Sequence, residues 1–377
     1  MTLRRSFDNV DIPQRSESSP AREILSQETF HRVISLERRR TERSRKPFML
    51  MLVDSVGHQS EIVRENLGKL LAVLSASTRE TDVIGWYESD RVAGGMFTEI
   101  GAGDRATIVT AMTARLNEIL HSNLSIEQFR ISFHVFPEDW DLEMRKRPSN
   151  PPLYPDLSKR NAARRISGAL KRGMDIVGSM LALVLCTPLF LGIALAIKAT
   201  SRGPVFFRQR RIGQHGVPFV FLKFRSMHVG NDANIHKEYV TRLIAGKAQR
   251  NPSNGNGEGV FKLTQDPRIT RVGAFLRRTS LDELPQFINV FKGEMSLVGP
   301  RPPVPYEVEA YDLWHRRRLL EAKPGITGLW QVSGRSRVTF DEMVRLDLRY
   351  ARTWSLWMDI KILWRTPGAV VLGEGAH

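Results

Sequence analysis

The sequence is poor in cysteine: Cys186 is the single cysteine among 377 residues. One thiol cannot form an intramolecular disulfide, so no disulfide framework supports the fold, which is typical of a reducing compartment. The first residues lack the continuous apolar run of a secretory leader, and we expect no cleavable signal peptide. No segment recurs at a fixed period, which excludes a repeat architecture.

Acidic residues are scarce relative to basic ones. Aspartate and glutamate total 40, against 56 lysines and arginines, and the formal net charge is +16. This excess indicates an anionic partner, which the charge alone leaves open as a nucleic acid, an acidic lipid surface or a phosphorylated substrate. The length is sufficient for two domains with their own cores.

The N-terminal part has the pattern of an α/β domain. Residues 1–28 are polar and contain Pro13 and Pro20, which predicts a flexible tail. From residue 29 to residue 141, short apolar or alternating runs that predict strands are interleaved with stretches of helical spacing, which indicates an α/β fold. The predicted strands are residues 49–53, 83–87, 92–97 and 129–135, and the predicted helices are residues 63–74 and 106–120.

A proline-rich stretch separates this domain from the rest of the chain. Residues 142–165 carry Pro148, Pro151, Pro152 and Pro155 among polar residues. Because proline interrupts helices and sheets, we expect a linker without a continuous helix or strand. The second domain then covers residues 166–377.

A long apolar run opens the second domain. Residues 176–197 contain no charge over 22 positions, and a bilayer span needs roughly 20 residues; a buried core helix is the alternative. Pro188 should kink the helix, because it removes a backbone hydrogen bond. Basic residues lie on both sides of the run, and the positive-inside rule disfavours sending either side across the membrane. A re-entrant helix that breaks at Thr187–Pro188 satisfies both observations.

Five ordered motifs follow this run and carry a close resemblance to a known family. The motifs are KFRSM at 223–227, DPRIT at 266–270, RRTSLDELPQ at 277–286, SLVGPRP at 296–302 and PGITGLWQVSGR at 324–335. They resemble the bacterial polyprenyl-phosphate glycosylphosphotransferases, over residues 172–377. The resemblance implies an α-rich monotopic membrane domain with a re-entrant helix, placed on the bacterial inner membrane and facing the cytoplasm.

The same resemblance implies the reaction and its partners. The family moves a sugar-1-phosphate from a UDP-sugar to undecaprenyl phosphate, a polyprenyl phosphate, with Mg²⁺ as cofactor, and so starts polysaccharide or glycoconjugate synthesis. Asp282 is then the nucleophile that forms a phosphosugar–aspartyl intermediate, and Glu283 helps to hold Mg²⁺ together with Asp282. Membrane lipid is a further expected partner, nucleic acid is not expected, and a homodimer is left open. From the residues alone, Ser280-x-x-Glu283 is also a helix capping box, and both interpretations are compatible.

Several cations are candidates for binding the substrate phosphates and nucleotide. Lys223 and Arg225 have strand spacing i, i+2, which places both on one face of a strand, although solvated surface cations are the alternative. Of Arg277 and Arg278 we assign one, Arg278, to the phosphate site and expect the other on the membrane surface. The resemblance gives Arg301 to the nucleotide. The motif glycines, Gly325, Gly328 and Gly334, are expected to form turns.

The C-terminal segment is amphipathic and rich in tryptophan. Trp354, Trp357 and Trp364 alternate with basic residues, which suits a helix at the membrane interface; a packed core helix is the alternative.

The N-terminal domain weakly resembles a degenerate GGDEF-type domain. The pieces that carry the resemblance are ERRRTER at 37–43, LVDS at 52–55 and RETDVIGWY at 79–87. The turn after Tyr87 lacks the paired glycines of that family, and Arg91 stands where its glutamate belongs, so we expect no cyclase activity. A regulatory or dimerising module and a plain α/β scaffold both stay open.

Three function classes therefore compete on sequence grounds. A membrane transferase is favoured by the apolar run and the motifs. A signalling cyclase or cyclic-dinucleotide sensor is disfavoured by the altered turn, and a nucleic-acid binder is favoured only by the net charge.

Overall fold

The computed structural model describes residues 23–55, 61–98, 100, 129–138, 150–163, 165–228, 234–247, 268–333 and 338–371, with a few positions between 107 and 114. The chain forms two compact units. The first combines residues up to Val33 with Phe48–His134, and the second combines Ile34–Pro47 with Val135–His377. The predicted flexible tail, most of the helix predicted at 106–120 and Gly334 lie outside the described residues.

The first unit is built on a four-stranded sheet with the strand order β2-β3-β1-β4. The strands are β1 (Phe48–Ser55), β2 (Val83–Glu88), β3 (Val92–Phe97) and β4 (Phe129–Phe136), and helix α2 spans Glu61–Ser77. Strand β3 pairs antiparallel with both β1 and β2. The predicted strands and the helix at 63–74 are thus confirmed. Residues 48–53 are almost fully buried, because this central strand is covered on both faces.

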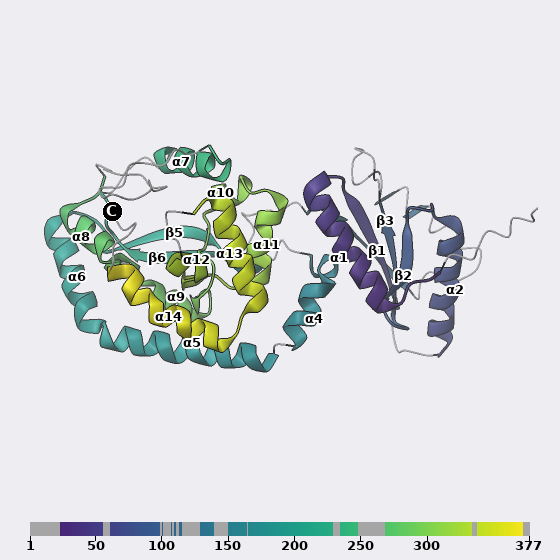
Figure 1. Cartoon of the computed structure of the whole chain (residues 1–377), viewed down its shortest axis with the longest axis horizontal. Coiled ribbons are helices and arrows are strands. Elements are labelled where there is room, and N and C mark those ends of the chain that lie inside the picture. Colours follow the sequence, from purple (N-terminus) through teal and green to yellow (C-terminus); the bar gives the residue numbers. More distant parts are fainter. Residues whose placement is uncertain are drawn as a thin grey trace, which may run out of the picture. The chain divides into compact units, whose positions relative to one another are not determined.

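Two glycines let the start of helix α1 (Gln27–Ser44) approach the sheet closely. Gly85 and Gly94 face each other across β2 and β3. A Cβ on Gly94 would lie 2.4 Å from the ring of Phe30, and one on Gly85 would lie 2.8 Å from Leu25. Figure 1 shows α1 on one side of this sheet and α2 on the other. The packing of Phe30, which is fully buried, depends on these two positions.

The second unit is rich in short helices around two small sheets. The hairpin β5–β6 (Phe206–Ile212 and Pro218–Phe224) is antiparallel, and strands β7 (Ser296–Val298) and β8 (Gly325–Thr327) are parallel. The other elements are η2 (Pro151–Leu153), α4 (Pro155–Ala163), α5 (Arg165–Leu185), α6 (Thr187–Thr200), η3 (Gln214–Gly216), α7 (Asn234–Ile244), α8 (Arg271–Arg278), η4 (Leu281–Glu283), α9 (Gln286–Lys292), α10 (Pro305–Glu309), α11 (Leu313–Glu321), α12 (Leu329–Ser333), α13 (Phe340–Thr353) and α14 (Leu356–Val371).

The segment predicted as a linker contains two of these elements. Residues 139–149 lie outside the described part, but η2 and α4 follow and belong to the second compact unit. The expectation that this stretch holds no helix is wrong from Pro155 onward. Pro151 and Pro155 each open their helix, where the missing backbone N–H costs nothing because no intrahelical acceptor exists there.

The apolar run forms two helices that meet at a bend. No single described helix is long and apolar enough to cross a membrane, but α5 and α6 pass that test together and are bent by 59° at a break between Leu185 and Thr187. Pro188 occupies the first turn of α6, and the Thr187 hydroxyl donates to the carbonyl of Leu183 at 2.8 Å. The kink therefore follows from the proline, and the threonine satisfies a carbonyl at the bend.

Three residues between positions 171 and 175, near the middle of α5, attach this helix to the core of the second unit. Lys171 Nζ lies 2.6 Å from Asp359 Oδ2 of α14 and 3.1 Å from the carbonyl of Val298. Arg172 donates to the carbonyls at the end of α9, and Asp175 accepts from the Leu297 amide of β7 at 2.9 Å. Figure 1 shows α5 along one edge of this unit, with the hairpin inside.

The C-terminal tryptophans divide between core and surface. Trp354 donates to the buried Asp359 carboxylate at 2.9 Å. Trp357 and Trp364 on α14 are 73% and 87% exposed. The segment therefore combines both interpretations of its sequence pattern, since one face of α14 packs on the core and the other is exposed.

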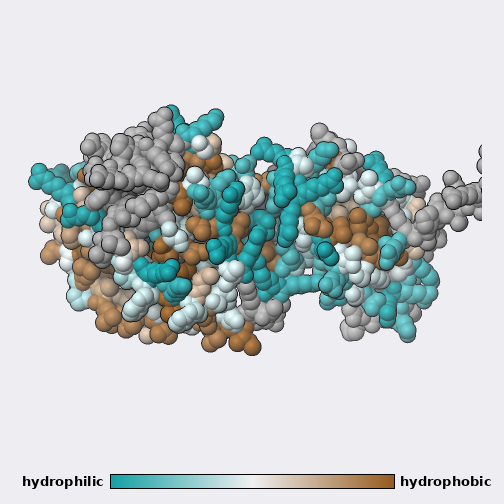
Figure 2. All heavy atoms as spheres, viewed as in Figure 1, coloured by the Kyte–Doolittle hydropathy of each residue, from teal (hydrophilic) through white to brown (hydrophobic). Residues whose placement is uncertain are grey.

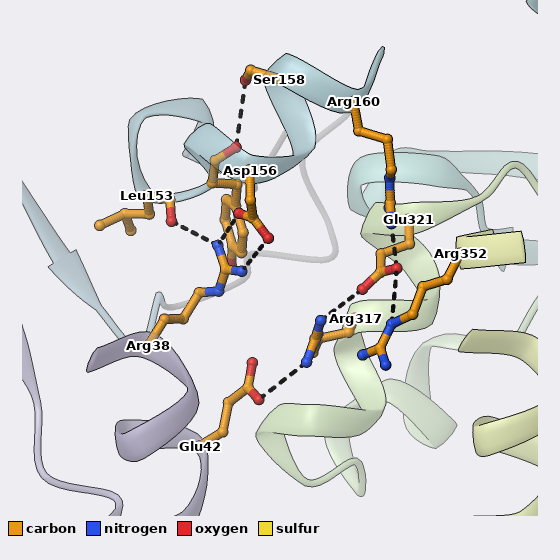
Figure 3. A network of polar contacts seen from close by, with 10 residues as sticks. Arg38, Glu42, Leu153, Asp156, Ser158, Arg160, Arg317, Glu321 and Arg352 are labelled. Carbon is orange, nitrogen blue, oxygen red and sulfur yellow. Dashed lines mark hydrogen bonds and ion pairs between the residues drawn. The ribbon is translucent and has the colours of Figure 1, made fainter. Parts of the chain in front are cut away.

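The second half of α1 is part of the second unit and is held there by ion pairs. Arg38, which is 1% exposed, donates to both oxygens of Asp156 at 2.9–3.0 Å and to the carbonyl of Leu153 at 2.8 Å. Glu42 lies 3.7 Å from Arg317 of α11, as Figure 3 shows. These side chains bind α1 to α4 and α11.

The parallel pair β7–β8 and the turns that follow it require glycine. A Cβ on Gly325 would lie 2.0 Å from the amide nitrogen of Gly299, and one on Gly328 would lie 2.4 Å from the Gly299 carbonyl oxygen. Both atoms belong to backbone, which cannot move aside. Gly325 and Gly328 thus permit close approach of two chain segments, a role different from the turns that we expected.

We expect Gly325→Ala to lower the apparent Tm of the detergent-solubilised protein strongly, because the new methyl group overlaps the Gly299 backbone; overpacking of this kind costs about 1–3 kcal/mol or more. Gly168→Ala is the matched control, since no atom lies within 4 Å of its added Cβ and alanine favours a helix by about 1 kcal/mol. Equal Tm values for the two variants would show that the segments can separate freely.

Candidate active site

The β5–β6 hairpin places Lys223 at the centre of a charged cluster. Lys223 pairs with Phe207 in the hairpin register, and the outer edge of β6 is held by Asn289 of α9. Asn289 is fully buried, accepts from the Leu222 amide at 3.1 Å and donates to the Val220 carbonyl at 2.7 Å. The side chain of Asn289 thus supplies hydrogen-bond partners for backbone groups of β6 that have no neighbouring strand. It thereby fixes the strand that carries Lys223.

Asp282 and Glu283 lie on η4, directly after α8. Ser280 precedes them with φ 55° and ψ 16°, in the left-handed region. A serine in this region costs roughly 1 kcal/mol or more, and such strain is often found at functional sites. The expected capping box is absent: the Ser280 side chain makes no cap bond, and the Glu283 side chain binds Lys223.

Lys223 bridges the two carboxylates. Its Nζ lies 2.7 Å from Glu283 Oε1 and 3.5 Å from Asp282 Oδ2. Asp282 is 6% exposed, whereas the Glu283 side chain is 35% exposed. The structure therefore brings together three of the residues that the sequence indicated, one buried carboxylate, one accessible carboxylate and one ammonium.

The two carboxylates differ in their electrostatics. Burial raises the pKa of Asp282 above its ordinary value, and the charges of Lys223 and Arg277 offset this only in part. For Glu283 burial also acts to raise the pKa, but the closer Lys223 ammonium and Arg301 outweigh it, and the net pKa is lowered. The environment thus favours the ionised form of Glu283 and disfavours that of Asp282, so the two neighbouring carboxylates are shifted in opposite directions.

Two of the three arginines assigned to the substrate site from the sequence, Arg225 and Arg278, do not join the cluster as expected. Arg225 follows the end of β6, is 5% exposed and donates to the carbonyls of Ser201 and Arg202 at 2.9 and 3.0 Å. It therefore caps the C-terminal end of α6. Arg278 lies over the ring of Phe275 at 6.0 Å. Arg277 is the residue of this pair whose charge acts on Asp282.

Arg301 lies on a segment whose carbonyls are all fixed. The carbonyl of Pro300 accepts from Gly325 N at 2.9 Å, and that of Arg301 accepts from Arg318 Nη2 at 3.0 Å. The carbonyl of Pro302 accepts from Arg211 Nη1 at 2.8 Å, and that of Pro303 accepts from Ile212 N at 2.9 Å. Prolines supply no N–H, so the segment is positioned through its acceptors, and Arg301 is presented on a rigid support.

Arg211 is a site residue that the sequence reasoning missed. It is 7% exposed, and its guanidinium lies 5.1 Å from the centre of the Phe221 ring. Burial and the neighbouring charge of Arg301 lower the pKa of Arg211 to about 10, against the opposing effect of Glu307 and Glu283. Glu307 also lies 3.4 Å from Arg301. The cluster thus contains more cations than the motifs indicated.

The signal for these residues was present but ambiguous. Arg211 belongs to the basic run at 208–211, which we interpreted from the sequence as a positively charged flank of the apolar run. Arg277 is adjacent to Arg278, and the sequence does not distinguish the two. Only the helical phase of α8 and the hairpin register distinguish the members of each group, and both follow from tertiary structure.

The carboxylates fit a magnesium ion that binds with its substrate. No group of three or more His, Cys, Asp or Glu side chains suited to a metal occurs among the residues the structure describes. Mg²⁺ commonly uses one or two carboxylates and completes its shell with water and substrate phosphates. Asp282 and Glu283 supply two carboxylates at neighbouring positions, and Glu283 is accessible. The donor set therefore suits such an ion and does not suit a dedicated protein cage.

The motifs, the hairpin and this cluster define a sugar transferase domain. Residues 166–373 match the family model described as "Bacterial sugar transferase", and the chain belongs to this family. One relative is the galactosyl transferase CpsE of Streptococcus agalactiae, 47% identical over 55% of this chain and 43% of its own length. The undecaprenyl-phosphate galactose phosphotransferase of Salmonella typhimurium is 47% identical over 58% of this chain and 44% of its own length.

A shorter relative is matched almost completely. The exopolysaccharide production protein ExoY of Rhizobium meliloti is 41% identical over 61% of this chain and 96% of its own length. The chain thus spans less than half of the first two relatives and nearly all of ExoY. Among solved structures, a DGC protein from Thermotoga maritima is 19% identical over 37% of this chain and 97% of its own length, at a TM-score of 0.28. Similarity at that level carries no argument about the first unit.

Removal of the Arg318 side chain should destabilise the second unit. Arg318 is 2% exposed and lies 2.7 Å from the equally buried Asp347. Arg318→Met leaves this carboxylate unpaired, which costs about 3–5 kcal/mol, whereas Arg318→Met combined with Asp347→Leu should recover the part of the loss that is due to the unpaired charge, since the Arg301 carbonyl loses its donor in both variants. Thermal unfolding in detergent measures both, with the exposed Arg208→Met as control. A double variant as unstable as the single one would contradict the ion-pair account.

Proposed function

We propose that this protein is a phosphoglycosyl transferase that moves a sugar-1-phosphate from a UDP-sugar to undecaprenyl phosphate. The observation that carries the proposal is the buried Asp282 carboxylate within 3.5 Å of Lys223, beside the accessible Glu283. Relatives named as an undecaprenyl-phosphate galactose phosphotransferase and a glucose-1-phosphate transferase support it. The name of ExoY, an exopolysaccharide production protein, supports a role at the start of polysaccharide synthesis.

The reaction balances as two displacements at one phosphorus. An ionised Asp282 oxygen attacks the sugar-bearing phosphorus of the donor, and the bond to the bridging oxygen breaks. That oxygen leaves with its electron pair as part of UMP, and a phosphosugar–aspartyl intermediate remains. A phosphate oxygen of the lipid acceptor then attacks the same phosphorus. The Asp282 carboxylate leaves, and the product is a polyprenyl diphosphate sugar.

The cations of the cluster would bind the phosphate oxygens. Lys223 already pairs with both carboxylates and can exchange them for an incoming phosphate, while Arg301 and Arg277 extend the positive charge on either side. Arg211 fixes the Arg301 segment. Because Asp282 is shielded from bulk water, these charges act at a lower effective dielectric constant than at an exposed site.

Magnesium would bind at Asp282 and Glu283 together with the donor diphosphate. When bound, it would neutralise charge on the phosphate oxygens. Burial acts to raise the pKa of Glu283, but the Lys223 charge outweighs this effect and the net pKa is lowered. Glu283 therefore remains ionised at neutral pH and is available as a ligand.

The exposed face of α5 and α6 supports a monotopic position in the inner membrane. Large apolar side chains cover it: Ile166, Leu170, Val177, Met180, Leu181, Val184, Leu185, Leu191 and Leu195 are all more than half exposed. Figure 2 shows hydrophobic side chains along this edge. A patch of this extent on a water-soluble protein would be unusual. A re-entrant α5–α6 pair, with the site facing the cytoplasm where UDP-sugars occur, accounts for the bend and the basic flanks.

Asp282→Asn should abolish UMP release, by at least about 1,000-fold, because the amide keeps the shape of the side chain and loses the attacking charge. A panel of UDP-sugars with undecaprenyl phosphate and Mg²⁺ provides the assay. Glu309→Gln, an exposed acid-to-amide change on α10, is the matched control and should retain full activity. Release of UMP by a folded Asp282→Asn protein at the native rate would disprove the nucleophile assignment.

Lys223→Gln should shift the acidic limb of the pH–rate profile to higher pH. The nucleophile acts in its ionised form, and the Lys223 charge lowers the pKa of Asp282 against the raising effect of burial. Without that charge the effect of burial on Asp282 is opposed less strongly, so the Asp282 pKa rises and the acidic limb moves to higher pH. Lys292→Gln, an exposed change on α9, should leave the limb in place. A limb at the native position in Lys223→Gln would mean that Asp282 does not limit the rate at low pH.

A further inference from the structure

A pocket of about 430 Å³ lies between α11 and α13, and it shares no residue with the cluster around Asp282. Four arginines line it: Arg317 from α11, with Arg345, Arg349 and Arg352 from one face of α13. Trp314 and Leu348 form its apolar wall. We call these six residues the arginine pocket.

The arginine pocket carries positive charge that the described part of the chain does not balance. Arg345 and Arg349 are exposed, and neither has a carboxylate partner among the described residues. Glu321 is shared: it lies 2.9 Å from Arg317, 3.9 Å from Arg352 and 3.1 Å from Arg160. Figure 3 shows the three guanidinium groups converging on this one side chain.

One further acid reaches the pocket from α1. Glu42 lies 3.7 Å from Arg317. Arg317 and Arg352 thus share Glu321 with Arg160, and Glu42 lies beside Arg317, so that Arg345 and Arg349 remain as two positive charges without a carboxylate among the described residues. Spacing along α13 places Arg345, Arg349 and Arg352 three and four residues apart, so that like charges repel one another on one helix face. A bound anion would relieve that repulsion.

The chemistry of the lining selects the class of anion. Guanidinium groups bind phosphate oxygens through paired N–H donors, and the three acceptor oxygens of a phosphomonoester allow more than one guanidinium group to bind it. Trp314 and Leu348 offer a surface for a flat or apolar group next to the charge. Two unmatched positive charges correspond to the two negative charges of a phosphomonoester at neutral pH.

We propose that the arginine pocket binds a phosphomonoester dianion that is attached to a flat or apolar group. The group is either the headgroup of an anionic lipid or a small soluble phosphate ester. The lipid source is consistent with the fold, because α14, with its exposed Trp357 and Trp364, follows Arg352 and Thr353 directly. Basic pockets between helices beside a membrane commonly bind acidic headgroups.

The test measures binding by calorimetry on the full-length protein in a neutral detergent. The soluble probe is phenyl phosphate. The lipid probe is dihexanoyl phosphatidic acid below its critical micelle concentration, with dihexanoyl phosphatidylcholine as the reference. Arg345→Gln combined with Arg349→Gln removes two charges that hold no ion pair in the described structure. Lys237→Gln combined with Lys247→Gln removes two exposed charges on and beside α7 and is the matched control.

Neither double variant touches the cluster around Asp282, so a phosphate bound there contributes equally to both. We expect the arginine variant to bind the probes at least tenfold more weakly than the native protein and the lysine control, with an unchanged Tm. The probe that loses more affinity identifies the source of the phosphate. Equal affinities in the two double variants, or binding of neither probe by the native protein, would overturn the proposal.

Discussion

The attachment of α5 to the core is the constraint on which the second unit depends. Lys171, Arg172 and Asp175 reach inward from the middle of a helix whose opposite face is apolar and exposed. Asp359, the partner of Lys171, is fully buried, and it is also bonded to Tyr350 and Trp354. A buried charge of this kind is tolerated only when its partners are complete. One stretch of α5 therefore fixes α9, β7 and α14 relative to the helix that carries the exposed apolar face.

The segment that follows β7 connects this core to the site. The strand leads into residues 300–303, whose carbonyls are held by β5, β8 and α11. Arg318 of α11 holds the Arg301 carbonyl and pairs with Asp347 of α13, while the neighbouring Arg317 and Leu348 line the arginine pocket. The two faces of α11 thus belong to two different clusters. A shift of α11 would therefore move Arg318 and Arg317 together and change both clusters.

Much of this arrangement could be predicted from the sequence, for identifiable reasons. Strong periodicity placed β1, β2, β3 and α2, and the apolar run with Pro188 placed the bend. The resemblance of the motifs to a known family assigned Asp282, Glu283 and Lys223 to one site, and the structure brings them together although Lys223 lies 60 residues from Glu283 in the sequence. The rest depended on tertiary contacts. Arg225 caps α6, and Ser280 adopts a left-handed conformation; neither follows from local propensity.

The backbone crowding around Gly299 also bears on how intolerance to substitution at a position would be interpreted. A selection for polysaccharide production scores only the final product, so it cannot separate a lost nucleophile from a lost fold. Gly299, Gly325 and Gly328 would rank in such a screen beside Asp282, although the nearest atoms to their missing side chains are backbone. At these positions substitution fails because two chain segments lie too close to each other to accommodate a Cβ. Protein abundance, recorded next to product, is the quantity that distinguishes steric from chemical necessity.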